Sequence, residues 1–292
     1  MITVDQAFET FRQRLELSET ERNNASKRQT EVRECIGAKF DVDRDWLTRS
    51  YGRHTKTKPL KDVDIFFALR EKERKWRDKG PSEVLGAFQD CLAAKYGKDA
   101  VDPGRRCVTV EFEKNTKDEE GKVLSIDAVP AFELEDCYEI PDRVLGKWIK
   151  TDPDVHAGKS TATNKALNGK WVPLVKMLKR WNRSAGGPIK PSFLIEVMAH
   201  DLVDPPFTTY AREVQRFFAA VPAVLSGAWP DPSGFGPPVS DQMTPDLVQK
   251  AISALRTAER NASLAMRIEA QGKTGEALKL WGDIMGRYFP TS

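Results

Sequence analysis

The stretch that most constrains the fold is DVDIFFAL, residues 62–69, in which two aspartates separated by one valine precede an apolar run. This pattern is typical of a β-strand, in which successive side chains point to opposite faces. Asp62 and Asp64 are therefore expected on one face, with Val63 directed into the core. Two carboxylates this close repel each other unless a positive charge lies near them. The chain thus needs a sheet here and a cation beside the acids.

Length and composition are those of an ordinary soluble globular protein. The 292 residues are long enough to bury a large core, and 40% hydrophobic with 30% charged residues exclude a disordered chain. A net charge of +3 is too small to indicate nucleic-acid binding. The longest apolar stretch, FFAAVPAVL, is too short for a membrane span and is interrupted by Pro222. We expect a cytoplasmic protein without a membrane segment, whose cysteines are reduced thiols: Cys35, Cys91, Cys107 and Cys137.

The periodicity predicts an α/β part followed by a helical part. Helices are expected from residue 3 to about 40 and over 82–97, with strands at 45–50, 62–69, 106–113 and 122–132. The last two strands are joined by the polar turn 114–122 and are expected in the same sheet as 62–69. After about residue 140 the strand signals stop, and helices are predicted at 170–184, 191–203, 211–225, 244–271 and 274–289. Residues 226–245 are rich in proline and glycine and predict an irregular loop, and Thr244 and Thr274 are the expected helix caps.

The predicted fold class is α+β, in two domains. Residues 1–150 would hold the N-terminal helices and a catalytic core with a mixed β-sheet, and residues 151–292 a helical lobe. The carboxylates are expected to face the cleft between these two domains.

A third acid and a hydroxyl complete a candidate site. Asp127 in SIDAVPAF lies between apolar residues on a predicted strand, where an isolated acid is hard to tolerate. Together with Asp62 and Asp64 it would offer the oxygen ligands that Mg²⁺ prefers, enough for two ions roughly 4 Å apart. Ser50 is expected to end a strand before a Tyr-Gly turn, where a hydroxyl and backbone N–H groups suit a phosphate. A basic loop follows this turn and holds Arg53, His54, Lys56, Lys58 and Lys61. These residues predict a site that holds a nucleoside triphosphate through magnesium.

The motif SYGRHTKTKPLKDVDIFF resembles the signature of polymerase-β-like nucleotidyltransferases. The surrounding residues look most like the cyclic-oligonucleotide synthases of bacterial antiphage defence, relatives of cyclic GMP-AMP synthase and oligoadenylate synthase. IDAVPAF resembles the family's third-acid motif, and LVKMLKRWNR with KPSFLIEVMAH resembles its helical-lobe signature. The resemblance implies a polymerase-β-like lobe with Asp62, Asp64 and Asp127 as catalytic metal ligands. It further implies that Ser50, Lys179 and Ser192 contact phosphates and that Phe193 stacks on a base.

Arg49 departs from this pattern, since it stands where the family usually has glycine. Glycine there lets the backbone come close to phosphate. An arginine would either reach the phosphates itself or reduce and redirect the activity.

The function implied by the resemblance is the joining of nucleoside triphosphates, ATP included, into a cyclic di- or trinucleotide. Two Mg²⁺ or Mn²⁺ ions would be the cofactors, and the product would act on a separate effector protein. A linear 2′–5′ oligoadenylate synthase, a transferase that modifies protein or RNA, and a catalytically silent nucleotide-binding module remain as alternatives. Activation by nucleic acid is not favoured, because the charged run at 70–79 is most simply a solvated helix face.

Overall fold

The computed structural model describes residues 2–60, 62–112 and 124–292. Contacts divide the chain into two compact units. One unit, which we call the sheet unit, is Leu17–Ala157. The other, which we call the helical unit, combines Met1–Glu16 with Gly158–Ser292. The first sixteen residues thus group with the C-terminal half, whereas the sequence-based division at residue 150 keeps all N-terminal helices with the catalytic core.

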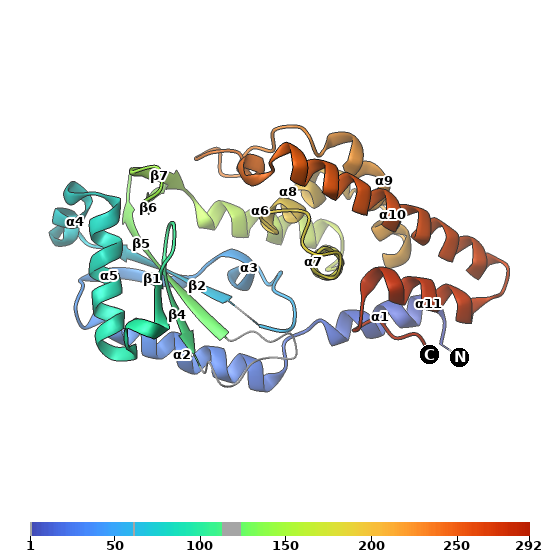
Figure 1. Ribbon diagram of the computed structural model, residues 1–292, viewed down its shortest axis with the longest axis horizontal. Helices are drawn as coiled ribbons and strands as arrows, with labels where there is room; N and C mark the ends of the chain where they lie inside the picture. The colour runs from blue at the N-terminus through green and yellow to red at the C-terminus, as the bar shows by residue number, and fades with distance from the viewer. Residues whose placement is uncertain (1, 61, 113–123) are drawn as a thin grey trace. The chain divides into compact units, whose positions relative to one another are not determined.

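The sheet unit is built on a mixed sheet, for which seven strands are found in the described part of the chain. Five strands run in the order β1-β2-β5-β4-β3, and β6 pairs with β5 and β7 with β6. Only the β2–β5 pair is parallel among the pairs found there (Figure 1). The strands are β1 (Val42–Leu47), β2 (Asp62–Leu69), β3 (Val101–Pro103), β4 (Val108–Phe112), β5 (Leu124–Glu133), β6 (Tyr138–Asp142) and β7 (Lys147–Thr151).

Two long helices, α2 (Glu19–Gly37) and α5 (Pro81–Tyr96), share one apolar core with the sheet. Alternate residues of β2, such as Val63 and Ile65, enter this core because strand side chains alternate between faces. Helix α2 begins at a capping box in which Ser18 and Glu21 exchange hydrogen bonds. This box explains why the N-terminal helical region is two helices with a break at 15–18 rather than one. Short helices complete the unit: α3 (Arg49–Gly52), η1 (Glu71–Glu73), α4 (Arg74–Lys79) and η2 (Lys98–Ala100).

The hairpin β6–β7 corrects the expectation that strands end near residue 140. Tyr138 and Ile140 join an apolar cluster on the sheet face opposite to α2 and α5. Between them Glu139 is only 5% exposed, and it is paired with Arg77 from α4. The sequence shows Glu139 as a charge that breaks the apolar pattern, because its partner lies 62 residues away.

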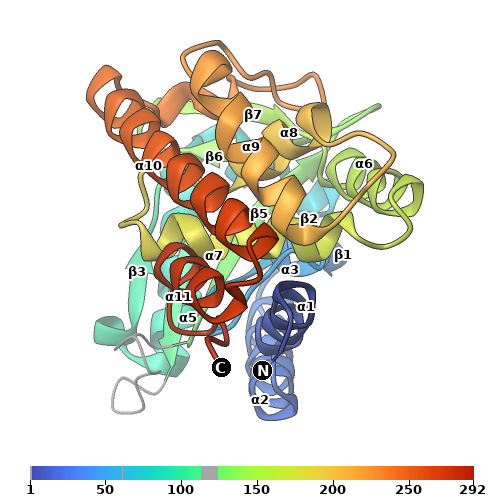
Figure 2. The same cartoon turned by 90° about the vertical axis from the view of Figure 1, so that its right-hand side faces the viewer.

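The helical unit has a single large core that includes the N-terminal helix α1 (Val4–Arg14). Phe8 of α1 packs edge-on against Trp281, with ring centroids 4.9 Å apart, and against Phe289 at 5.1 Å. Figure 2 shows α9 and α10 running side by side. The remaining elements are α6 (Pro153–Ala166), which the division between units crosses, α7 (Trp171–Ser184), α8 (Phe193–Leu202), α9 (Tyr210–Val224), η3 (Val239–Gln242), α10 (Pro245–Ala270) and α11 (Thr274–Met285).

Three further expectations about elements have clear outcomes. Thr244 caps α10, since its side chain accepts the Leu247 N–H. Thr274 does not cap α11: it is the first helical residue, after Lys273 at the cap position. Ser50 does not end a strand, because β1 stops at Leu47 and Ser50 lies in α3. The predicted turn 114–122 lies outside the described residues.

No helix in the described residues is long and apolar enough to cross a membrane.

Candidate active site

Asp62 and Asp64 lie on the same face of β2, as the strand period predicts. Val63 and Ile65 belong to the core beneath α2 and α5, whereas Phe66 belongs to the apolar cluster of the opposite face. Since side chains alternate along a strand, Asp62 and Asp64 share the face of Phe66. Asp64 is buried at 1% exposure, and the Asp62 side chain is about half exposed.

The parallel pairing of β2 with β5 brings the third acid to the same place. Asp64 and Asp127 are register partners, and Asp62 is opposite Ser125. Ile126 and Ala128 on either side of Asp127 enter the α2–α5 core, so Asp127 points to the other face. Neighbouring strands lie about 4.8 Å apart. We call the sheet face that carries Asp62, Asp64 and Asp127 the acid face.

Thr109 of β4 holds the Asp127 carboxylate. It is the antiparallel partner of Asp127, and its hydroxyl donates a 2.6 Å hydrogen bond to Asp127 Oδ1. A bond of this length to a carboxylate is charge-assisted and fixes the orientation of the acceptor. Sequence reasoning missed Thr109. The available signal was one hydroxyl residue among the buried valines of VTV, on the strand that pairs with Asp127.

Lys56 places a cation beside Asp62, one of the two neighbouring aspartates. Its Nζ lies 2.8 Å from Asp62 Oδ2, and the lysine side chain is only 9% exposed. The basic loop is therefore not a solvated surface: Arg53 and Lys56 are both buried, as are Thr55 and Thr57. Lys56 therefore places a buried positive charge directly beside a carboxylate of the acid face.

The turn that carries Ser50 is joined to β2 by one backbone hydrogen bond and closed by another within the turn. The Thr48 N–H donates to the Asp64 carbonyl at 3.0 Å, and the Thr55 N–H donates to the Ser50 carbonyl at 2.9 Å. Gly52 is required here, because a Cβ at this position would overlap the Leu47 carbonyl oxygen. Gly52 is therefore the position at which the turn comes close to the Leu47 backbone. Position 49, where the resemblance expects glycine, forms the start of α3, and the Arg49 side chain lies outside the described residues.

The residues predicted to contact phosphate and base on the helical unit differ in burial and in their contacts: Lys179, Ser192 and Phe193. Lys179 of α7 is buried, and its Nζ lies 2.6 Å from Glu196 Oε1 of α8, a carboxylate with no exposed surface. Ser192 is exposed at the start of α8, and Phe193 is half-buried against the core of the helical unit. The sequence did not reveal Glu196 as the partner of Lys179. Both residues lie among apolar residues on their helices, and nothing in the sequence shows that the two charges face each other.

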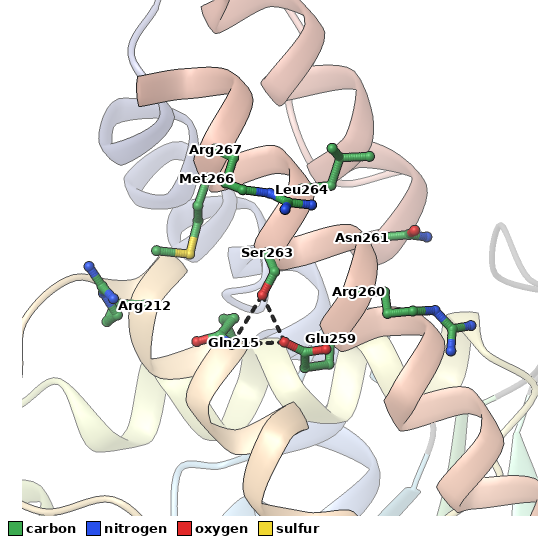
Figure 3. Close-up of a pocket in the computed structure, with 9 residues that line it drawn as sticks. All are labelled: Arg212, Gln215, Glu259, Arg260, Asn261, Ser263, Leu264, Met266 and Arg267. Carbon is green, nitrogen blue, oxygen red and sulfur yellow. Dashed lines mark hydrogen bonds between the residues drawn. The ribbon is translucent and has the colours of Figure 1, made fainter. Parts of the chain in front are cut away.

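A surface hollow of about 670 Å³ lies on the helical unit between α9 and α10 (Figure 3). Its floor is a hydrogen-bonded triad in which Gln215 donates to Glu259 and Ser263, and the Ser263 hydroxyl donates to Glu259 at 2.7 Å. None of the predicted site residues lines it. The lining residues are Arg212, Gln215, Glu259, Arg260, Asn261, Ser263, Leu264, Met266 and Arg267.

The acid face combines adjacent strand carboxylates, a buried basic loop and a hydroxyl-bearing turn on a mixed sheet. This arrangement defines the class of nucleotidyltransferases that bind a triphosphate beside strand acids. Residues 1–164, more than half of the chain, match the family model SMODS, the second messenger oligonucleotide or dinucleotide synthetase domain. The chain belongs to this family and is a nucleotidyltransferase of the kind that makes oligonucleotide second messengers.

Known relatives agree with this assignment. A probable cyclic nucleotide synthase of Bacillus cereus strain VD146 is 26% identical over 274 residues, 83% of this chain and 81% of the relative. The cyclic AMP-AMP-AMP synthase of an Acinetobacter species is 24% identical over 321 residues, 100% of this chain and 87% of the relative. The solved structure of E. coli MS115-1 CdnC with ATP has a TM-score of 0.72 and 18% identity, covering 99% of each chain. The last likeness shows the fold.

The acids fit divalent metal ions, which nucleotidyltransferases of this family generally use. Asp62, Asp64 and Asp127 offer oxygen ligands alone, the set that Mg²⁺ prefers, on adjoining strands of one face. In their described positions, the His, Cys, Asp and Glu side chains of the described residues form no cluster of three or more able to hold a metal. The Asp62 carboxylate instead contacts Lys56. The three acids therefore offer the type of ligand that a divalent ion prefers, on one face of the sheet.

Proposed function

We propose that this protein joins nucleoside triphosphates, ATP among them, into a cyclic di- or trinucleotide with release of pyrophosphate, in bacterial antiphage signalling. The observation that carries the proposal is the parallel register of Asp64 and Asp127, with Asp62 on the same face, in a chain of the second-messenger synthetase family. We place the activity in the cytoplasm, because nucleoside triphosphates are available there. The names of the cyclic nucleotide synthases to which the chain is similar support a cyclic product.

In the proposed mechanism the three aspartates would hold two Mg²⁺ or Mn²⁺ ions. Asp62 and Asp64 would bind both, and Asp127, oriented by Thr109, would complete the site beside the acceptor nucleotide. When bound, the ions would neutralise the triphosphate and favour ionisation of the acceptor hydroxyl. The acceptor oxygen would attack the α-phosphorus of the donor, the α–β phosphoanhydride bond would break, and the hydroxyl proton would leave toward Asp127.

The turn and the basic loop beside the acids would hold the donor phosphates. Ser50 lies on a turn tied to β2, and Lys56 and Arg53 place buried positive charge in the adjoining loop. By resemblance, Lys179 and Ser192 would contact the phosphate tail and Phe193 would stack on a base. Because the Lys179 ammonium group already pairs with Glu196, it would have to contact the carboxylate and a phosphate at the same time.

The test is to incubate the purified protein with Mg²⁺ or Mn²⁺ and four labelled nucleoside triphosphates, treat with phosphatase, and analyse the products by chromatography and mass spectrometry. We expect a phosphatase-resistant species with the mass of a cyclic di- or trinucleotide. Asp62→Asn with Asp64→Asn should abolish both this species and pyrophosphate release while leaving the circular dichroism spectrum unchanged. Synthesis retained by that variant would refute the assigned site.

Other outcomes identify the alternatives directly. A product that loses its terminal phosphates to phosphatase is linear, which would replace the cyclic proposal by an oligoadenylate-type synthase. Nucleotide binding without pyrophosphate release would indicate a silent binding module. We further propose that the cyclic product acts on a separate effector protein. Addition of the purified product to a candidate effector tests this step independently of the synthase.

A further inference from the structure

Two cysteines from distant parts of the sequence meet between α2 and α5, away from the acid face. Cys35 Sγ and Cys91 Sγ lie 3.9 Å apart. Each sulfur also lies near the carbonyl oxygen of the other residue, 3.6 Å for Cys35 Sγ to Cys91 and 3.4 Å for Cys91 Sγ to Cys35. The two side chains therefore lie alongside each other and do not point apart. Both residues are free thiols.

The two sulfurs lie in van der Waals contact. A disulfide requires an S–S distance of about 2 Å and approaching Cβ atoms, and χ1 rotations of two facing cysteines shorten a gap of this size without moving helices far. Both helices pack on the same sheet face, so the sheet holds the two positions at a fixed separation.

The two thiols differ in exposure, which sets the order in which they react. Cys35 is half-buried and reachable from solvent, while Cys91 is 6% exposed. Burial, with a smaller contribution from Cys35, raises the pKa of the Cys91 thiol to about 11. The thiolate is the nucleophile toward peroxides, so Cys35 is the side chain that an oxidant attacks first.

We propose that Cys35 and Cys91 are an oxidation site, at which a hydroperoxide converts the two thiols into a disulfide that links α2 to α5. In the first step the Cys35 sulfur attacks the peroxide, the O–O bond breaks, and Cys35 sulfenic acid and an alcohol form; hydrogen peroxide gives water in place of the alcohol. In the second step the Cys91 sulfur attacks the sulfenic sulfur and water leaves. Each thiol sulfur loses one electron overall, and the two electrons reduce the O–O bond.

The bond would act on the part of the chain that carries the candidate site. The segment from 35 to 91 contains β1, α3 and β2, and therefore Ser50, Asp62 and Asp64. Closing this long segment into a loop restricts the unfolded chain and so favours the folded sheet unit. Oxidation would thus make the sheet unit more resistant to unfolding, and a thiol reductant would reverse the effect.

The test uses the full-length folded protein with hydrogen peroxide at a small molar excess in non-denaturing buffer. Remaining thiols are alkylated after unfolding and counted by mass spectrometry. We expect two of the four cysteines to become unreactive, a loss of two hydrogens per chain, and a linked pair of peptides that contain Cys35 and Cys91 and separate with dithiothreitol. Four alkylated cysteines, sulfenic or sulfinic acid without a link, or a link to Cys107 or Cys137 would each overturn the proposal.

Two controls connect the result to the native geometry. The same oxidation in urea should give mixed pairings. Equal selectivity in the unfolded chain would show that the fold does not direct the bond. Cys35→Ser, at the half-buried position, and Cys91→Ala should each leave no internal link.

The thermal midpoint of the oxidised wild-type protein should exceed that of the reduced protein by several degrees, whereas peroxide should not raise the midpoint of either variant. An equal or lower midpoint for the oxidised wild type would refute the stabilising role.

Discussion

Thr109 positions an acid of the candidate site without offering a metal ligand of its own. Thr109 lies on the neighbouring strand, and its hydroxyl donates a 2.6 Å hydrogen bond to Asp127 Oδ1. Hydrogen bonds of this kind orient ligating carboxylates, and their loss typically costs roughly 10- to 100-fold in activity or metal affinity. The residue is therefore a positioning residue whose effect should appear in metal dependence more than in nucleotide affinity.

We accordingly predict that Thr109→Val, which keeps the branched shape, lowers kcat/KM by roughly 10- to 100-fold and raises the Mg²⁺ concentration needed for half-maximal rate. The KM for ATP should change little, and Thr109→Ser, which keeps the hydroxyl, should stay near wild type. The measurement is pyrophosphate release over a Mg²⁺ titration. A Thr109→Val enzyme with an unchanged Mg²⁺ requirement would show that the hydrogen bond has no role in the site.

At the scale of elements, the pair Lys179–Glu196 joins α7 to α8 inside the helical unit. Both side chains are buried, with Nζ and Oε1 2.6 Å apart. Breaking a buried ion pair leaves one charge without its partner and typically costs roughly 3–5 kcal/mol, whereas replacing both members by apolar residues is often neutral. The structural and phosphate-binding roles of Lys179 can therefore be separated by mutation.

We predict that Glu196→Gln lowers the free energy of unfolding by roughly 3–5 kcal/mol, measured by urea denaturation. The double change Lys179→Met with Glu196→Leu should recover most of this loss. If Lys179 also holds a phosphate, the double variant should remain folded with a KM for ATP raised at least about tenfold, because a charge-assisted hydrogen bond contributes about 1.5–3 kcal/mol. A stable double variant with wild-type KM would confine Lys179 to the ion pair.

The β6–β7 hairpin is held at its turn by Asp142, whose side chain is fully buried. Burial alone would raise its pKa, but hydrogen bonds from Arg105, from the Leu145 N–H and from Arg106 outweigh burial and lower the pKa to about 2. The Arg105 and Arg106 Nε atoms each lie 2.9 Å from a carboxylate oxygen. The ionised form is therefore the one that the fold stabilises.

A lowered folded-state pKa gives a definite sign for the pH dependence. The Asp142 contribution is fully present above the ordinary value of 3.8 and is lost as the pH falls from there through about 2. It amounts to about 2 kcal/mol. We predict that the stability difference between wild type and Asp142→Asn, measured by urea unfolding at several pH values, is constant from pH 5 to 7 and shrinks below pH 4. A difference that grows at low pH would contradict this assignment.

On the scale of the whole molecule, the N-terminal helix stabilises the C-terminal half. Phe8 is 1% exposed and packs on Trp281 and Phe289. Truncation of a buried phenylalanine to alanine costs roughly 3–5 kcal/mol. The cost should fall on the helical unit, although the residue lies near the start of the chain.

We predict that Phe8→Ala accelerates amide hydrogen exchange in α7 and α11 and leaves β2 and β5 protected. The matched control is Phe88→Ala, which removes a buried ring from the core of the sheet unit and should give the opposite pattern. Equal loss of protection in both units from either variant would show that the two cores unfold as one.

Much of the fold and the acid set could be predicted from the sequence, because the relevant signals are local. The period of two in DVDIFFAL and SIDAVPAF places three aspartates on strands and determines which way they face. The helical period likewise predicts α7 to α11 with small errors at their ends. A short hairpin such as β6–β7 escapes this reasoning, since its charges Glu139 and Asp142 are neutralised by arginines remote in sequence.

The sequence by itself determined the strand that carries Asp62 and Asp64, the residue types of the candidate metal site and the family motif. Only the tertiary structure decided that Asp64 and Asp127 are register partners and that Thr109 and Lys56 hold the carboxylates. It also decided that Lys179 is paired with Glu196. The periodicity of a sequence indicates which face of an element a side chain occupies. A charged side chain is buried at low free-energy cost only beside a partner of opposite charge. Partners that are distant in sequence meet only in the tertiary structure.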